Sequence, residues 1–525
     1  MARIAPLSAL ILALALPVTG VASDDPDSSW LPSWFRAQIE AEPTLPAPRI
    51  AVPDRPTSRD EWAQLIDETW GEGRPTVDKL DFFHLFWDTI DQQFPCFQDL
   101  DVDWLALREA YRFEVARGVS RGRFAAIMSR LSLALMEAHT DALVKEVAWR
   151  TPFEPGIPLL RVGAWGWITE FGACLTPLPD GSLLVYRAPD DHPLALEPGD
   201  VVLGYEGRPW SQLYPELLDY GLPAAGFWGS SPETYEHAWL MAAGANWHLF
   251  ETIDVLRHET GEVVSLETSP MASWGYRLWC TEQLDVPGVV VPDYFQQQIV
   301  SWGIIEGTRI GYIYGWGWGW NAEQEFRDAV TALLPPEVTD GLIIDFRFNL
   351  GGNLSLSNAG LALLFDHPAA TIDFVTRCDP SDHLGLCEEG LFAQFVIPGD
   401  PGSFYDRPIA VLVGPGAVSS GDQVALRLKF HPNARFFGSS TNTSFNAPAV
   451  MHDETDYYAQ YAVADAYLLT QPGEYLTHDP FPVDEAVWLT PDDVAAGRDS
   501  VVDAAVRWIR ESTGGPRRAG GRVSP

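Results

Sequence analysis

Residues 341–352, with the sequence Gly-Leu-Ile-Ile-Asp-Phe-Arg-Phe-Asn-Leu-Gly-Gly, decide the fold. Positions 342–344 form an uninterrupted apolar run, which predicts a strand that is covered on both faces. Gly351 and Gly352 end that strand, and glycines there let backbone N–H groups face a ligand without a Cβ in the way. Residues 354–365 predict a helix, so these amides are expected near a helix N-terminus. A left-handed turn that only joins strand to helix is the alternative.

A second strand–turn–helix unit downstream favours the ligand-binding interpretation. We expect strands at 309–315, 408–415 and 434–438, helices at 321–334 and 423–430, and a turn at 416–422. Strands that alternate with helices predict an α/β core with a parallel sheet and right-handed crossovers. Both turns then lie at the carboxyl edge of that sheet, where such folds bind ligands.

The regions before this core differ from it in pattern. Residues 59–150 predict a helical domain, in which an apolar helix face ends in the turn 137–140, Glu-Ala-His-Thr. Residues 151–300 predict short strands and turns, and the hairpin at 196–207, from Leu-Glu-Pro-Gly-Asp to Glu-Gly, resembles that of PDZ domains. The α/β core is assigned to residues 301–513. The chain is therefore expected to be a multidomain α/β protein.

The two ends of the chain look like segments outside the fold. Arg3, an apolar run at 7–16 and small residues at 21–23 predict a signal peptide over residues 1–23. Residues 24–58 are a Pro-rich linker, and the basic, Gly-containing tail 514–525 is expected to be disordered. No later stretch is long and apolar enough to span a membrane. We therefore expect an exported soluble protein, periplasmic or extracellular.

Composition excludes some partners and cofactors. The net charge of −38 argues against nucleic acid as a partner, because phosphate contacts need a basic surface. The five cysteines have irregular spacing, which is not a disulfide scaffold, although Cys378 and Cys387 could pair in an oxidising compartment. Neither Cys-x-x-Cys nor His-Glu-x-x-His occurs, so no metal or other cofactor is expected.

Ser419 is the candidate nucleophile, because it follows a predicted strand and precedes a predicted helix. The amide of Ser420 and that of Gly351 or Gly352 could form an oxyanion hole from the two turns. His139 ends an apolar helix in the Ala-His-Thr turn and could take the hydroxyl proton. The structural alternatives are a helix N-cap for Ser419 and a helix-end residue for His139.

Five motifs in the same order resemble the S41 family of serine peptidases, the tail-specific and tricorn-like C-terminal processing peptidases. They are Glu-Ala-His-Thr at 137–140, the hairpin at 196–207, Asp-x-Arg-x-Asn-x-Gly-Gly at 345–352, Ser-Ser-Gly-Asp at 419–422, and the segment from Thr490-Pro491 to Gly-Arg-Asp at 497–499. The resemblance implies a ClpP/crotonase-like core and cleavage of peptides through an acyl-enzyme.

The family activates its serine in two ways, with lysine or with histidine. The region expected to carry the lysine, residues 441–444, has the sequence Thr-Asn-Thr-Ser, which favours the histidine scheme with His139. The third group in that scheme projects near Thr477, which is not an acid. Asp479 is our choice, with Glu474 and Thr477 as the alternatives.

The sequence thus predicts an exported serine endopeptidase that acts on protein or peptide substrates. The rival is an inactive S41-like protein that binds peptide termini or, given 21 Trp, glycans. Trp316, Trp318 and Trp320 are expected to pack in the core, with lining of a substrate cleft as the alternative. An esterase on the same core is a further rival, although a Gly-x-Ser-x-Gly elbow is missing. Natural substrate and oligomeric state are not specified.

Overall fold

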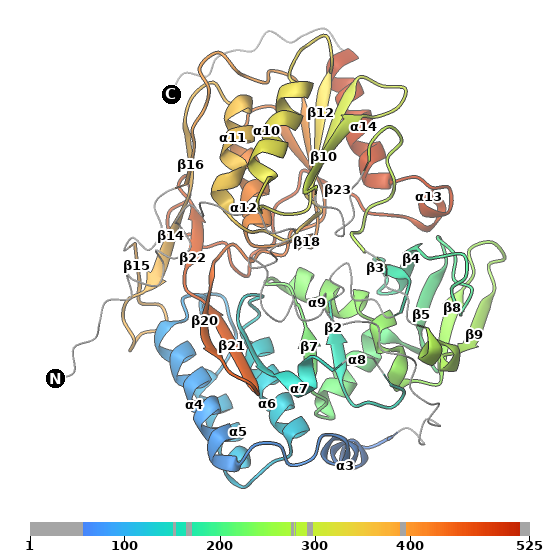
Figure 1. Ribbon diagram of the computed structural model, residues 1–525, viewed down its shortest axis with the longest axis vertical. Coiled ribbons are helices and arrows are strands. Elements are labelled where there is room, and N and C mark those ends of the chain that lie inside the picture. Colours follow the sequence, from blue (N-terminus) through green and yellow to red (C-terminus); the bar gives the residue numbers. More distant parts are fainter. Residues whose placement is uncertain are drawn as a thin grey trace, which may run out of the picture. The chain divides into compact units, whose positions relative to one another are not determined.

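Six strands form the central sheet of the α/β region (Figure 1). In spatial order they are β10 (Val300–Ile304), β11 (Ile310–Gly315), β12 (Gly341–Asp345), β17 (Ile409–Val413), β19 (Ala434–Gly438) and β23 (Glu485–Ala486). Strands β11 to β23 run parallel, and β10 is an antiparallel edge strand. Every residue of β12 and β17 is buried, as their apolar runs require. The predicted parallel sheet is confirmed.

The structure is a computed structural model that describes residues 56–150, 154–163, 171–274, 278, 280–290, 298–388 and 395–514. The predicted signal peptide, residues 1–23, and all but the last three residues of the predicted linker lie outside these ranges. The predicted tail also lies outside them except for residue 514, which is the last residue of α14 (Ser500–Gly514). The described residues all fall within one unit, Glu42–Pro525.

Helices cover both faces of the central sheet (Figure 1). On one side lie α10 (Ala322–Leu333), α11 (Asn358–Leu361) and α12 (Ser420–Arg427), and on the other lies α14. The helix predicted over 354–365 is instead a succession of three short pieces, because α11 is flanked by the 3₁₀ turns Leu354–Ser357 and Ala362–Leu364. The helix predicted over 321–334 is α10, which begins after Asn321, and the Asn321 side chain makes no capping hydrogen bond.

The N-terminal region is helical, as predicted. It contains α3 (Arg59–Trp70), α4 (Thr76–Gln93), α5 (Trp104–Ala116), α6 (Arg121–Ala134) and the short α7 (Lys145–Ala148). Ser58 and Glu61 form a capping box at the start of α3. The strand β1 (Asp141–Val144) then pairs with β21 (Tyr457–Ala462), whose other neighbour is β20 (Pro448–Asp453). Residues assigned to the core therefore also build the N-terminal region.

The predicted β-rich region contains a sheet of six strands with two helices beside it. The strands are β3 (Cys174–Pro177), β4 (Leu183–Arg187), β5 (Val201–Tyr205), β6 (Arg208–Pro209), β8 (Thr252–Leu256) and β9 (Val263–Glu267), and the helices are α8 (Trp210–Asp219) and α9 (Pro232–Met241). The hairpin predicted at 196–207 is β5 and β6, with Glu206 and Gly207 in the left-handed turn between them. The short strands β2 (Leu160–Val162) and β7 (Ala224–Gly226) pair separately.

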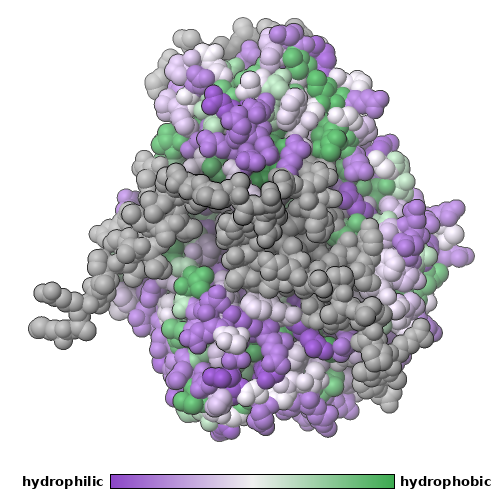
Figure 2. Space-filling model, viewed as in Figure 1, coloured by the Kyte–Doolittle hydropathy of each residue, from purple (hydrophilic) through white to green (hydrophobic). Residues whose placement is uncertain are grey.

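A further small sheet flanks the core. It consists of β14 (Ala369–Arg377), β15 (Leu386–Cys387), β16 (Phe395–Ile397) and β22 (Asp465–Leu468). Among the described residues, no helix is both long and apolar enough to cross a membrane. Much of the described surface on the face shown in Figure 2 is hydrophilic.

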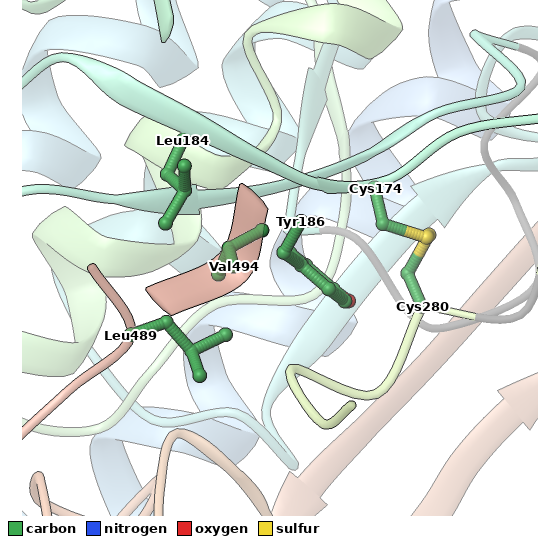
Figure 3. Close-up of a cluster of buried hydrophobic side chains, with 6 residues drawn as sticks. All are labelled: Cys174, Leu184, Tyr186, Cys280, Leu489 and Val494. Atoms are coloured by element: carbon green, nitrogen blue, oxygen red, sulfur yellow. A yellow bond between two sulfur atoms is a disulfide. The ribbon is translucent and has the colours of Figure 1, made fainter. Parts of the chain in front are cut away.

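Two disulfides join four of the five cysteines. The short disulfide, Cys378–Cys387, forms as the sequence suggested. The long-range disulfide, Cys174–Cys280, was not predicted, because it depends on a fold that brings together residues 106 positions apart. Its sulfurs lie in a buried cluster with Leu184 and Tyr186 of β4 and with Leu489 and Val494, next to and within α13 (Pro491–Ala495) (Figure 3). Cys96 is a buried free thiol.

Candidate functional site

The two turns predicted at the carboxyl edge of the sheet lie side by side. The short strand β13 (Phe348–Asn349) pairs in parallel with β18 (Gly416–Ala417), and the Val418 amide donates to the Asn349 carbonyl at 2.9 Å. The buried Asn349 side chain fixes the first turn, because its Nδ2 donates to the Gly315 carbonyl at 2.8 Å and its Oδ1 accepts from the Gly351 amide at 3.0 Å. The Gly-Gly turn and the serine turn are thus one rigid unit.

Ser419 occupies a strained position at the start of α12. Its backbone has φ 60° and ψ −124°, which is costly for a residue with a Cβ. Its side chain makes no capping hydrogen bond, so the N-cap alternative is not what the hydroxyl does. The residue is partly exposed, whereas the rest of α12 is buried. A sharp strand-to-helix turn of this kind presents a hydroxyl in front of a sheet.

Gly351 and Gly352 approach the serine turn closely. A Cβ on Gly351 would lie 2.7 Å from the Val418 carbonyl oxygen and 2.8 Å from Ser419 Cβ, and the φ of Gly351 is +78°. The Gly352 carbonyl accepts from Ser420 Oγ at 2.6 Å. Within the described part of the chain, the amides of Gly352 and Ser420 donate no hydrogen bond, whereas that of Gly351 is engaged by Asn349. Of the predicted oxyanion donors, Gly352 and Ser420 are therefore available.

His139 lies in the turn between α6 and β1 and is 7% exposed. Its Nδ1 lies 2.9 Å from Asn446 Oδ1 and 3.2 Å from Glu137 Oε1. Glu137 also accepts from the His139 amide at 3.0 Å and from Thr140 Oγ1 at 2.6 Å, which holds the turn closed. Since both neighbours of Nδ1 are acceptors, Nδ1 carries the proton and Nε2 is left as the basic nitrogen.

A buried chain of polar groups continues behind His139. Asn446 Nδ2 donates to Thr477 Oγ1 at 3.3 Å, and Thr477 Oγ1 donates to Asp465 Oδ1 at 2.6 Å. Burial raises the pKa of Asp465 to about 6 and raises the pKa of the neighbouring Cys96 thiol well above its usual value. This chain fixes the amide orientation of Asn446, so that Oδ1 faces the imidazole.

The loop at 439–446 connects the serine turn with the histidine turn. Asp422, one helical turn after Ser419, accepts from the amides of Thr443 at 3.0 Å and Ser444 at 3.2 Å. Ser444 Oγ lies 2.6 Å from Ser230 Oγ, which accepts from the amide of residue 138 at 2.9 Å. Burial raises the pKa of Asp422 to about 7, while hydrogen bonds and the charge of His139 oppose that rise. His139 is thus near α12, although Ser419 Oγ and His139 Nε2, both in the described part, share no hydrogen bond.

The two acids considered as the third catalytic group do not contact His139. Glu474 and Asp479 are both exposed, and Glu474 accepts instead from Gln471 at 2.9 Å. The choice of Asp479 is therefore corrected, since the groups that touch Nδ1 are Asn446 and Glu137. Thr477 lies one hydrogen bond further back. Glu137 belonged to the quoted motif, but no pattern in the sequence pointed to Asn446.

The chain has three lysines, and all of them make contacts elsewhere. Lys79 donates to the carbonyls of residues 72 and 119 at 2.6 Å, and Lys145 pairs with Asp453 at 2.6 Å. Lys429 donates to the Pro482 carbonyl and lies 4.1 Å from the ring centre of Phe436. None of these ammonium groups contacts Ser419 in the described structure.

A buried ion network joins two of the matched motifs. Arg347 is completely buried and pairs with Asp345 at 2.6 Å and with Asp499 at 2.9 Å. Its charge is thus satisfied by one carboxylate from the core strand and one from the C-terminal segment. The network therefore ties the core strand to the C-terminal segment.

Of the tryptophans at the end of β11, Trp316 and Trp318 are buried and Trp320 is 48% exposed. The Trp318 backbone forms an isolated bridge with Gly352, because its amide donates to the Gly351 carbonyl at 2.7 Å. Packing is therefore the role of Trp316 and Trp318, whereas Trp320 is available at the surface.

Comparisons with known proteins agree with these features. Residues 309–477 match the model of peptidase family S41, which confirms the resemblance drawn from the motifs. No curated protein matches the chain.

Three solved structures of peptidases are similar to the chain. Mature CPAF complexed with lactacystin has a TM-score of 0.56 at 13% identity, covering 83% of this chain and 98% of that one. The photosystem II D1 C-terminal processing protease has a TM-score of 0.40 at 16% identity, covering 79% and 94%. The tricorn protease has a TM-score of 0.40 at 13% identity, covering 84% and 37%. At 13% identity, the likeness to CPAF concerns the fold alone.

Proposed function

We propose that the protein is a serine endopeptidase that hydrolyses peptide bonds through an acyl-enzyme on Ser419, with His139 as the general base. The observation that carries the proposal is the strained backbone of Ser419 beside two amides without acceptors, those of Gly352 and Ser420. A hydroxyl, two convergent N–H donors and a helix N-terminus on one rigid unit match what a tetrahedral oxyanion needs.

In the first step, Ser419 Oγ attacks the scissile carbonyl carbon and its proton passes to His139 Nε2. The carbonyl oxygen becomes an oxyanion and accepts from the amides of Gly352 and Ser420. The imidazolium is stabilised through Nδ1 by the Glu137 carboxylate and Asn446 Oδ1. His139 then protonates the leaving amine as the C–N bond breaks, and water hydrolyses the ester with His139 again as base.

The proton transfer requires Nε2 within hydrogen-bond reach of Oγ. Catalytic hydrogen bonds are often long without substrate and shorten only in the complex. His139 sits on a turn that is tied to the loop at 439–446 rather than to α12 directly, so we propose that a shift of that loop brings the two groups into contact. Binding of the substrate is the event that we propose makes this shift.

The predicted signal peptide, the two disulfides and the β5–β6 hairpin are consistent with an exported enzyme that has a ClpP/crotonase-like core. A signal peptide over residues 1–23 would deliver the chain to an oxidising compartment, where both disulfides persist. The β5–β6 hairpin region would act as the PDZ-like part and hold a substrate C-terminus or gate the cleft.

Hydrolysis of an unstructured protein such as casein, and of a fluorogenic peptide library, tests the function. Wild-type protein is expected to cleave them, and Ser419→Ala is expected to lose turnover while its melting temperature stays within a few degrees of wild type. Turnover that survives in Ser419→Ala would refute the nucleophile. A folded wild-type protein that cleaves nothing would favour the inactive, peptide-binding alternative.

A further inference from the structure

A pocket that is open in part to solvent lies against the serine turn. One wall is the segment just before the nucleophile, with Pro415, Gly416 and Val418, and another is α9, with His237 and Met241. Because Val418 adjoins Ser419, a substrate residue close to the scissile bond can place its side chain there. The pocket is therefore positioned to select substrates.

The lining is mostly apolar and contains one carboxylate, that of Glu282. Phe227, Phe348 and Met241 supply apolar surface, which suits the methylene stem of a long side chain. Glu282 Oε1 accepts from Thr176 Oγ1 at 2.6 Å and pairs with His237 Nε2 at 2.8 Å. In the part of the chain that the structure describes, Oε2 has no hydrogen-bond partner. One carboxylate oxygen is thus free to accept from a ligand.

The charges around Glu282 leave the pocket negative. The nearest guanidinium is that of Arg347, whose Nη1 donates to the Glu282 carbonyl at 3.3 Å. Arg347 is already paired with two carboxylates, those of Asp345 and Asp499. The Glu282 carboxylate itself forms no salt bridge with an Arg or Lys side chain among the described residues, so a bound cation would supply its missing countercharge. The net charge of −38 would attract the same class of ligand from a distance.

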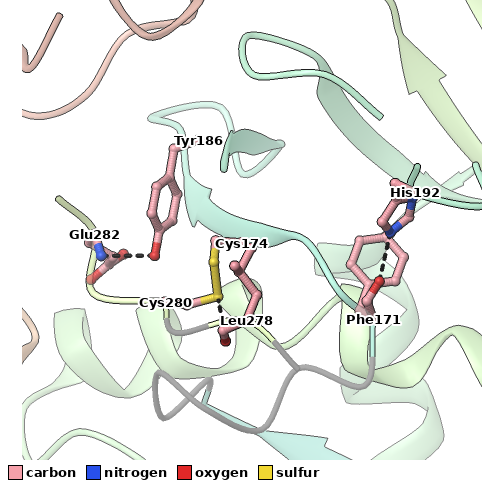
Figure 4. The surroundings of a disulfide bond; sticks show 7 residues. All are labelled: Phe171, Cys174, Tyr186, His192, Leu278, Cys280 and Glu282. Atoms are coloured by element: carbon pink, nitrogen blue, oxygen red, sulfur yellow. Dashed lines mark hydrogen bonds between the residues drawn. A yellow bond between two sulfur atoms is a disulfide. The ribbon is translucent and has the colours of Figure 1, made fainter. Parts of the chain in front are cut away.

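Glu282 is held rigidly, as a binding group should be. Its backbone has a φ of 54°, a strained value for a residue other than glycine. The Glu282 amide donates to Tyr186 Oη at 2.8 Å, and the long-range disulfide anchors the chain two residues earlier (Figure 4). Trp488 Nε1 donates to Thr176 Oγ1 at 2.7 Å, which orients the hydroxyl toward Glu282. Several elements thus combine to fix one buried carboxylate beside the serine turn.

We propose that this pocket binds a basic side chain, lysine or arginine, of the substrate residue next to the scissile bond, with Glu282 accepting from its charged group. The inference rests on the proposed function, because it assigns the substrate class of that same site. A charge-assisted hydrogen bond in a buried pocket corresponds to a roughly ten- to hundredfold preference for lysine over norleucine, which has the same stem without the charge.

The experiment compares kcat/KM for fluorogenic peptides in which lysine or norleucine is placed at each position flanking the scissile bond. The variants are Glu282→Gln and, as a matched control, Asp285→Asn, which removes a charge three residues away where the side chain is 98% exposed. Fluorophosphonate labelling of each protein reports whether the nucleophile is active, and the melting temperature reports folding.

We expect wild type and Asp285→Asn to prefer lysine at least tenfold at one position, and Glu282→Gln to lose that preference. If labelled wild type cleaves peptides without preferring lysine, or if Glu282→Gln keeps the preference, the pocket assignment is overturned while the peptidase function stands. If Glu282→Gln does not fold, competition on wild type decides. Inhibition by n-butylammonium but not by n-butanol supports the proposal, and equal effects overturn it.

If wild type neither labels nor cleaves, the proposed function fails separately. Fluorescence polarisation with the labelled lysine and norleucine peptides then tests the pocket by binding alone. Tighter binding of the lysine peptide to wild type than to Glu282→Gln supports the carboxylate pocket, and equal binding of both peptides contradicts it.

Discussion

Asn446→Leu tests the group that orients His139. The substitution keeps the side-chain size in a position that is 1% exposed and removes the acceptor 2.9 Å from Nδ1. It leaves Thr477 Oγ1 with its bond to Asp465, so the buried chain behind it stays satisfied. The substitution should therefore act mainly on the orientation of the His139 imidazole.

The magnitude follows from one hydrogen bond to a charged group. In the transition state His139 is an imidazolium, and a hydrogen bond to such a group contributes about 1.5–3 kcal/mol. The loss in kcat is then roughly ten- to hundredfold, with KM little changed. The contact of Nδ1 with Glu137 at 3.2 Å remains, which sets the residual activity.

The assay is steady-state hydrolysis of a fluorogenic peptide, with two comparison variants. Thr477→Val acts one hydrogen bond further from His139, so we expect a loss of about fivefold or less. Asp479→Asn changes an exposed carboxylate and should leave kcat unchanged. Wild-type kcat in folded Asn446→Leu, or an equal loss in Asp479→Asn, would refute the assignment of Asn446.

Three further substitutions test other parts of the structure. Gly351→Ala places a Cβ 2.7 Å from a backbone oxygen at a residue whose φ is +78°. The rate of peptide hydrolysis should therefore fall at least about a hundredfold, and a fall of less than tenfold would contradict the close packing of the two turns. Burial raises the pKa of Asp141 from 3.8 to about 7. The protonated carboxyl therefore contributes to folding stability below the pKa of the unfolded state, and this contribution is lost as pH rises through about 7. In urea unfolding, Asp141→Asn should therefore be more stable than wild type at pH 8. Its stability should fall less steeply than that of wild type between about pH 4 and pH 7, by up to about 1.4 kcal/mol per pH unit, and an unchanged slope would argue against the buried charge. Replacing the long-range disulfide by serines should lower the free energy of unfolding by about 4.8 kcal/mol, and replacing the short disulfide should lower it by about 2.6 kcal/mol. The difference arises because the disulfides close loops of 106 and 9 residues. Denaturant melts that give the reverse order would contradict the loop argument.

Local patterns explain why the sheet and its two turns were predictable. The runs in β12 and β17 are apolar without interruption, and a strand buried on both faces requires that composition. Ser419, Gly351 and Gly352 follow those strands directly, so their place at the sheet edge needs only the strand assignment. The preference for the histidine scheme needed only the lack of lysine in residues 441–444, and that scheme stays a prediction.

Long-range contacts explain what the sequence did not reveal. Asn446 meets His139 across 307 positions, and its role depends on the course of an irregular loop. Asp479 was chosen as an acid that flanks Thr477, the position to which the family pattern projects, yet Asp479 is exposed to solvent. The long-range disulfide likewise joins β3 to a segment 106 residues later, for which spacing gives no signal. Tertiary placement, and not residue type, decided these cases.

Labelling with a fluorophosphonate probe, followed by mass mapping of the modified peptide, tests the central claim most directly. The probe phosphonylates only a serine whose proton a base removes and whose oxyanion is stabilised. We expect a single adduct on Ser419 in wild type, and none in Ser419→Ala or His139→Ala. A folded wild-type protein that stays unlabelled, or an adduct on another residue, would contradict it.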